Sequence, residues 1–92
     1  MDSHTFNNLT TFQYLYLSGN NLTCIPSSLF NGLINLYMLL LDNNQLSSVG
    51  PAAFKGLTNL QFLDLRENQI TYIEKTTFNG LNNLNGLYLD LS

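Results

Sequence analysis

Four carboxylates and one guanidinium are the groups in this sequence whose types and spacing could support chemistry. The carboxylates belong to Asp42, Asp64, Glu67 and Asp90, and the guanidinium belongs to Arg66. Two carboxylates on one surface could act as general acid and general base, as in the hydrolysis of a glycosidic bond. That chemistry needs a pocket that desolvates one carboxylate and shifts its pKa. The elements that carry these residues decide whether such a pocket can form.

Other catalytic arrangements are missing from the sequence. His4 is the sole histidine and Cys24 the sole cysteine, so we expect neither a Ser/His/Asp triad nor an internal disulfide. There is no glycine-rich phosphate loop and no metal-ligand spacing. The sequence therefore predicts no catalytic residue, no metal and no cofactor. We expect Cys24 to be a small residue on the outer surface, the alternative being an intermolecular disulfide.

The elements that position these residues recur with a fixed period. The clearest marker is a leucine that returns every 24 residues, at Leu15, Leu39, Leu63 and Leu87. The same interval relates a second row of leucines, a row of asparagines and a row of phenylalanines, which are Leu17, Leu41, Leu65, Leu89; Asn20, Asn44, Asn68; and Phe6, Phe30, Phe54, Phe78. A period of this length indicates a solenoid, in which each repeat packs only on its neighbours.

Each repeat contains one short strand with a single buried face. The alternation in residues 62–65 places Leu63 and Leu65 on one side of the strand and the intervening residues on the other. Strands that recur once per coil must stack in parallel, about 4.8 Å apart. A smooth open sheet of this kind offers no pocket that would shift the pKa of a carboxylate. We therefore expect the acidic residues to form a solvated rim rather than an active site.

Three other recurring residue types are expected to shape the coil. Asn44 and its equivalents stand where the chain bends after the strand, and we expect their amides to bond backbone groups of their own and the adjacent coil. Phe54 and its equivalents should stack as an aromatic column under the outer arc. Gly32, Gly56 and Gly80 are expected in tight turns with positive φ. The outer arcs are too brief for more than a short turn or one helical turn.

The consensus L-x-x-L-x-L-x-x-N-x-I occurs at residues 60–70, with the same skeleton at 36–46 (LYMLLLDNNQL) and 12–22 (FQYLYLSGNNL). It resembles the 24-residue typical class of leucine-rich-repeat proteins, which includes Toll-like receptor ectodomains, the variable lymphocyte receptors of jawless vertebrates and Slit-like guidance proteins. The resemblance covers essentially the whole chain. It implies an α/β leucine-rich-repeat solenoid of four strands, with a curved parallel β-sheet on the concave side and short turns or 3-10 segments on the convex side. It also implies a non-enzymatic binding function.

The concave side of the sheet carries the candidate binding residues. We call this surface the concave face, and the residues expected to contact a ligand or partner are Tyr14, Tyr16, Tyr37, Met38, Leu40, Asp42, Phe62, Asp64, Arg66 and Tyr88. Strand alternation places this aromatic and methionine-rich set opposite the buried leucines. An exposed patch of this type normally marks a contact surface. The alternatives are self-association through the same patch, or no role beyond the preference of strands for Tyr and Phe.

The repeat boundaries predict a single leucine-rich-repeat domain over residues 1–92. It divides into a partial leading arc at 1–8, full repeats at 9–32, 33–56 and 57–80, and a truncated repeat at 81–92. Secreted members of the family usually carry cysteine-rich caps, and this sequence has none. Uncapped ends leave strand edges and half-covered leucine layers. We therefore expect either a piece of a longer receptor or association as a homodimer or an end-to-end oligomer.

Composition and charge narrow the range of partners. Hydrophobic residues make up 45% of the chain and charged residues 10%, which is too apolar for a disordered segment. The formal charge is -3, and no basic stripe is available to follow a phosphate backbone, so we expect no nucleic-acid partner. No stretch reaches the roughly 18 unbroken apolar residues of a spanning helix, so we expect no membrane insertion.

Two N-glycosylation sequons begin at Asn8 and Asn21 and favour an extracellular location, in a secreted protein or a receptor ectodomain. Asn21 should tolerate a glycan better, because Asn8 stands in a tight turn. Together with the resemblance, the sequence predicts an extracellular or innate-immune recognition module whose concave face engages a protein or a microbial surface molecule. The alternative is a structural repeat fragment that self-associates through its uncapped ends or its concave face.

Overall fold

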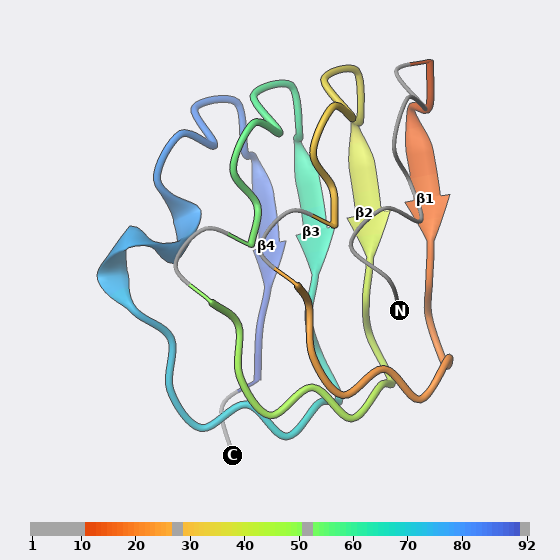
Figure 1. Cartoon of the computed structure of the whole chain (residues 1–92), viewed down its shortest axis with the longest axis vertical. Helices are drawn as coiled ribbons and strands as arrows, with labels where there is room; N and C mark the ends of the chain where they lie inside the picture. Colours follow the sequence, from red (N-terminus) through yellow and green to blue (C-terminus); the bar gives the residue numbers. More distant parts are fainter. Residues whose placement is uncertain (1–10, 27–28, 51–52, 91–92) are drawn as a thin grey trace.

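Four short parallel strands lie side by side in the computed structural model, which describes residues 11–26, 29–50 and 53–90 (Figure 1). The strands are β1 (Tyr14–Tyr16), β2 (Met38–Leu40), β3 (Phe62–Asp64) and β4 (Gly86–Tyr88), and one 3-10 helix, η1 (Lys75–Phe78), precedes β4. They form a single sheet in the order β1-β2-β3-β4. Each strand residue pairs with its repeat equivalent, so that Leu39 lies between Leu15 and Leu63. The predicted leucine-rich-repeat fold with four strands is therefore confirmed.

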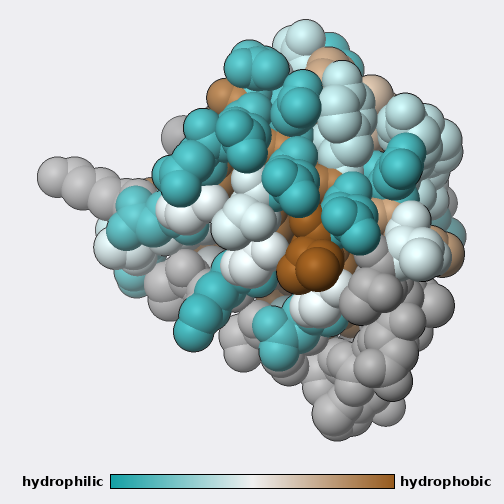
Figure 2. Space-filling view, turned by 90° about the horizontal axis from the view of Figure 1, so that it is seen from above, coloured by the Kyte–Doolittle hydropathy of each residue, from teal (hydrophilic) through white to brown (hydrophobic). Residues whose placement is uncertain are grey.

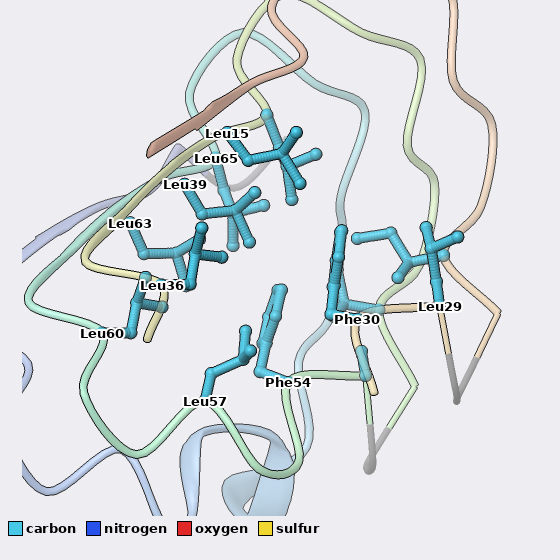
Figure 3. Packing of buried hydrophobic residues seen from close by; sticks show 14 of the residues in the cluster. Leu15, Leu29, Phe30, Leu36, Leu39, Phe54, Leu57, Leu60, Leu63 and Leu65 are labelled. Atoms are coloured by element: carbon cyan, nitrogen blue, oxygen red, sulfur yellow. The ribbon is translucent and has the colours of Figure 1, made fainter. Parts of the chain in front are cut away.

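Leucines from the strands and phenylalanines from the outer arcs meet inside the coils (Figure 3). Leu39 and Leu63 project in one row from neighbouring strands, and neither is exposed to solvent (0%). Phe30 stacks on Phe54 with ring centroids 6.3 Å apart, and Phe54 stacks on Phe78 at 6.0 Å. These three rings confirm the predicted aromatic column, whose first member at position 6 is outside the described residues. Burying one such side chain contributes about 1.5–3 kcal/mol, so the repeated rows supply much of the folding free energy.

Two asparagines, Asn44 and Asn68, each join their coil to the coil before it, and Asn44 is buried whereas Asn68 is half-buried. The Asn44 amide donates to the carbonyl oxygens of Leu17 and Leu41, each at 3.0 Å. Its Oδ1 accepts the backbone N–H of Asn20 at 2.8 Å. Asn68 repeats the pattern one coil further on, which confirms the predicted ladder at both positions. Asn20 itself is exposed, because β1 is the edge strand of the described sheet.

The turns that lead back into the strands use left-handed backbone conformations. Gly32, Gly56 and Gly80 have φ angles of 87°, 90° and 87°, as predicted. In the outer arcs of the described residues, η1 is the sole helical segment, which agrees with the expected short turns. No helix in the described ranges is long and apolar enough to span a bilayer. The short arcs leave the sheet as the element that arranges the candidate site.

Candidate ligand-binding face

The register of the sheet arranges the concave-face residues in rows that cross the strands. One row contains Tyr14, Met38, Phe62 and Gly86, and the next contains Tyr16, Leu40, Asp64 and Tyr88. Three further predicted residues flank the strands and join these rows. The Tyr37 ring contacts Tyr14, Arg66 lies over Tyr88, and the carboxylate of Asp42 accepts the Ser18 hydroxyl. The structure thus brings the predicted residues together on one surface.

Three tyrosines form an exposed group on the β1 side of this surface. Tyr14, Tyr16 and Tyr37 are 53%, 60% and 40% exposed. The Tyr14 ring meets Tyr37 edge to face with centroids 5.8 Å apart, and it lies 6.3 Å from Tyr16 at a tilt of 40°. Such rings present large apolar area and a polar hydroxyl with little conformational freedom to lose on binding. The group is suited to a contact surface.

A second aromatic group on the β3 and β4 side borders a hollow that Gly86 helps to line. The rings of Phe62 and Tyr88 lie 5.0 Å apart. A Cβ atom added at Gly86 would lie 3.2 Å from the Phe62 ring and 3.7 Å from the Tyr88 ring, so the rings occupy the space that a side chain would need. The hollow has a volume of about 270 Å³, and we call it the Gly86 hollow; it is lined by Tyr37, Met38, Gln61, Phe62, Asn85, Gly86 and Tyr88.

Asp64 departs from the expectation of a solvated carboxylate. It is only 4% exposed, because Arg66 covers it and donates to its two oxygens from Nε at 3.0 Å and from a terminal nitrogen at 2.8 Å. Hydrogen bonding from Arg66 lowers the pKa of Asp64, although burial opposes the shift. The guanidinium carbon of Arg66 lies 4.8 Å from the centroid of the Tyr88 ring. A ligand at this point would meet Arg66 and Tyr88 rather than the carboxylate.

The other acidic residues lie beyond the C-terminal ends of the strands. Asp42 accepts the side-chain amide of Asn43 at 2.8 Å, and Asp90 accepts the backbone N–H of Glu67 at 3.3 Å. Because Arg66 is already paired with Asp64, the remaining carboxylates give this edge of the concave face a net negative charge. In the part of the chain that the structure describes, no three His, Cys, Asp or Glu side chains are placed to hold a metal ion.

Sequence analysis missed the asparagines at the N-terminal ends of the strands. A hollow of about 500 Å³ there is lined by Gln13, Tyr14, Asn35, Tyr37, Asn59 and Gln61. The Asn59 amide donates to the carbonyl of Ile34 at 2.8 Å, and the Asn83 amide donates to the carbonyl of Thr58 at the same distance. Figure 2 views this end of the molecule, which is largely hydrophilic around an apolar area. The period itself could have revealed these residues, since asparagines recur at 35, 59 and 83.

The two sequons differ in what the structure describes. Asn21 is exposed, with a φ of 59°, whereas Asn8 lies outside the described residues. His4 also lies outside them. Cys24 is exposed and free, in agreement with the expected position on the outer surface.

Comparison with known proteins identifies both the sequence family and similar structures. The model of the family described as leucine rich repeat matches residues 1–46 and 34–91. The chain is 34% identical to TLR13 in a crystal structure of the TLR13–ssRNA13 complex, with a TM-score of 0.87 over 91% of this chain. It is 32% identical to Toll in the Drosophila Toll–Spatzle complex, with a TM-score of 0.93 over 97% of this chain. No curated protein matches the sequence.

The leucine-rich-repeat domain of APL1B is a third similar structure, with 31% identity and a TM-score of 0.94 over 99% of this chain. The similar chains are much longer, since this chain covers 12% of the TLR13 and Toll chains and 27% of the APL1B chain. The family match extends over nearly all of the sequence, and each similar structure shares the fold at more than 30% identity. The chain therefore belongs to the leucine-rich-repeat family.

Proposed function

We propose that this chain is a non-enzymatic recognition module that binds a protein or a microbial surface molecule through its concave face, as part of a cell-surface or innate-immune receptor. The similar structures support this assignment, because they include Toll in complex with Spatzle and TLR13 in complex with ssRNA13. The exposed tyrosines support the concave face as the surface that binds the ligand. Tyr16 is 60% exposed although its strand neighbour Leu15 is only 7% exposed, so the fold does not need the ring of Tyr16 in its core.

An extracellular or lumenal location accompanies this proposal. Asn21 is exposed within its sequon, so its side chain is accessible to a glycan. Mass spectrometry of the protein secreted from a eukaryotic host would show a mass increase that Asn21→Gln reduces. If the secreted protein carried no glycan, this support for an extracellular or lumenal location would be lost. The proposed role of the concave face would not change.

RNA remains a class of ligand that the experiment must include. TLR13 was solved with single-stranded RNA, so the relatives do not support the exclusion of nucleic acid expected from the sequence. For this chain, the uncompensated carboxylates Asp42, Glu67 and Asp90 repel a polyanion. We therefore favour a protein or an uncharged or cationic microbial molecule.

The test compares two exposed tyrosines on an array of purified secreted proteins, microbial polysaccharides and single-stranded oligoribonucleotides. Tyr16 lies on the concave face, whereas Tyr72 lies in a return arc and is 69% exposed. Tyr16→Ser should weaken binding of the captured probe about tenfold, as expected for the loss of one aromatic contact. Tyr72→Ser is the matched control and should bind as the unaltered chain does. Equal effects of the two substitutions would refute recognition by the concave face.

Self-association through the end of the solenoid is a second candidate, favoured by one observation. Leu87 is 40% exposed, whereas its register partner Leu63 is fully buried. Another coil or a second copy of the chain would cover it. Leu87→Lys should then lower the mass measured by sedimentation equilibrium, and a concentration-independent monomer for the unaltered chain would refute this candidate. Association through the two concave faces is disfavoured because it would bring their carboxylates together.

A further inference from the structure

We propose that the Gly86 hollow receives one aromatic or aliphatic side chain from an extended, basic segment of a protein partner. The inference rests on the proposed recognition function and specifies the chemistry of the ligand. Three features of the concave face carry it: the aromatic and thioether side chains that line the hollow, the amides beside it and the excess of carboxylates beyond it.

The side chains that line the hollow make it a place for an apolar group. Gly86 stands in the row where the other strands carry Tyr14, Met38 and Phe62. The Phe62 and Tyr88 rings are tilted by 50° to one another beside it, and Met38 lies on the other side of Phe62 in the row. Thioether and aromatic groups adapt well to a planar or branched side chain. An apolar side chain in the hollow would be shielded from water by Met38, Phe62 and Tyr88.

Two amides beside the hollow suit the backbone of a peptide. The Asn85 amide lies 3.5 Å from the Oε1 atom of Gln61, which is long for a hydrogen bond. Each amide therefore keeps donor and acceptor capacity for another group. An extended segment offers N–H and C=O groups at regular spacing, so it can use both amides while one of its side chains enters the hollow.

The charge beyond the hollow favours a basic residue on the same segment. Asp42, Glu67 and Asp90 lie past the strand ends, and Arg66 is occupied by Asp64. Asp90 follows Gly86 by four residues, which corresponds to roughly 13 Å along an extended chain. A partner segment that runs along the strands would therefore place a lysine or arginine about four residues from the anchoring side chain. The same carboxylates repel RNA and the acidic face of a second copy.

The experiment uses a short capped peptide of serines that carries phenylalanine and, four residues later, lysine. Its binding to the full isotope-labelled chain is followed by NMR at the amides of Gly86 and Phe62. Three further probes replace phenylalanine by alanine, replace lysine by glutamate, or substitute an oligouridylate for the peptide. These three probes test separately the anchoring side chain, the charge of the peptide and the class of macromolecule.

Gly86→Ala is the decisive variant, and Gly50→Ala is its matched control. Neither glycine has a positive φ, so alanine fits the backbone at both positions. An added Cβ at Gly50 has no neighbouring atom within 4 Å, whereas at Gly86 it meets the Phe62 ring. Moving the Phe62 ring, which lines the hollow, should weaken binding of the phenylalanine–lysine peptide about tenfold, the effect expected for losing one buried side-chain contact. Gly50→Ala should leave binding within about twofold of the unaltered chain.

Several outcomes would overturn the inference. They are no binding of the phenylalanine–lysine peptide, equal binding of the glutamate peptide, the same response to oligouridylate, or unchanged affinity in Gly86→Ala. Should Gly86→Ala fail to fold, Asp90→Asn tests the charge, because it should weaken the lysine peptide alone. If Tyr16→Ser abolishes capture on the array while Gly86→Ala does not, the concave face is the binding site and the proposed occupant of the hollow is wrong.

Discussion

The two sides of the sheet differ in whether equivalent positions carry the same residue in each coil. On the inner side, one row is leucine in every coil, at Leu15, Leu39, Leu63 and Leu87; the first three are at most 7% exposed, and Leu87 in the last strand is 40% exposed. On the outer side, the adjacent row reads Tyr16, Leu40, Asp64 and Tyr88. Identical shapes are needed where coils stack, because each layer must fit the next. No such constraint acts on the outer row, so the difference separates residues that build the solenoid from residues free to bind.

The inner side should be the more sensitive to truncation, with the largest effect at the centre of the aromatic column. Phe54 is fully buried and stacks on rings from both neighbouring coils. Phe54→Ala should lower the free energy of unfolding by about 4 kcal/mol, through lost transfer energy and the cavity left behind. Chemical unfolding followed by circular dichroism measures the change. Tyr72→Ala, on an exposed ring, is the control and should change stability by less than about 0.5 kcal/mol.

The asparagine ladder should be nearly as sensitive where it is buried. Asn44 is 7% exposed, and its loss leaves the carbonyl oxygens of Leu17 and Leu41 without this donor. Asn44→Ala should lower the free energy of unfolding by about 2–3 kcal/mol. Asn20→Ala removes an exposed amide whose side chain bonds only Ser18 among the described contacts, so less than about 1 kcal/mol is expected. Equal losses in the same unfolding assay would show that burial does not distinguish the two positions.

The Asp64–Arg66 pair is the place where the outer side contributes to stability. Arg66 lowers the pKa of Asp64, so the pair stabilises the folded chain above the ordinary carboxyl pKa and loses this effect as pH falls through the lowered value. Arg66→Gln should lower the free energy of unfolding slightly at pH 7, and the effect is small because the Arg66 side chain is 52% exposed. In urea titrations at successively lower pH, the difference from the unaltered chain should disappear as the pH falls through the lowered pKa of Asp64. An NMR titration should show a higher pKa for Asp64 in the variant.

The smallest expected change in stability concerns the left-handed backbone conformation of Glu67. Glu67 has a φ of 57°, and the equivalent positions are Gly19 and Asn43, which tolerate that region better. Glu67→Asn should raise the free energy of unfolding by about 0.5–1 kcal/mol. Thermal unfolding gives the sign directly. A decrease in stability would mean that the Glu67 side chain contributes more than its backbone strain costs.

The inner side was largely predictable from the sequence, because residues that stack between coils recur at the same position in each repeat. Leu63, Phe54, Asn44 and Gly56 occur in register with their equivalents, and each serves the role that its type and position indicated. A single strand could not have shown this, since a leucine or an asparagine taken alone fits many structures. The second row of asparagines carries the same signal and was overlooked, although Asn59 and its equivalents also join neighbouring coils.

The outer side was predictable in position but not in detail. Alternation places Asp64 on the concave face, yet its burial depends on Arg66 folding back over it. The hollow depends on how the Phe62 and Tyr88 rings lie around a residue with no side chain. The first contact lies within one repeat and the second joins two repeats, and the period specifies neither, because these positions carry different residues in each coil. The contacts that vary most between coils are therefore the ones that the sequence alone could not predict.

The most direct test of the division between the two sides is a paired measurement on Tyr16→Ser and Tyr72→Ser. Binding of the array-captured probe and the free energy of unfolding would be measured for both variants. Tyr16→Ser is expected to weaken binding about tenfold while stability changes by less than about 0.5 kcal/mol, and Tyr72→Ser is expected to change neither. Unimpaired binding by Tyr16→Ser, or a loss of binding matched by unfolding, would contradict the claim that the concave face is reserved for recognition.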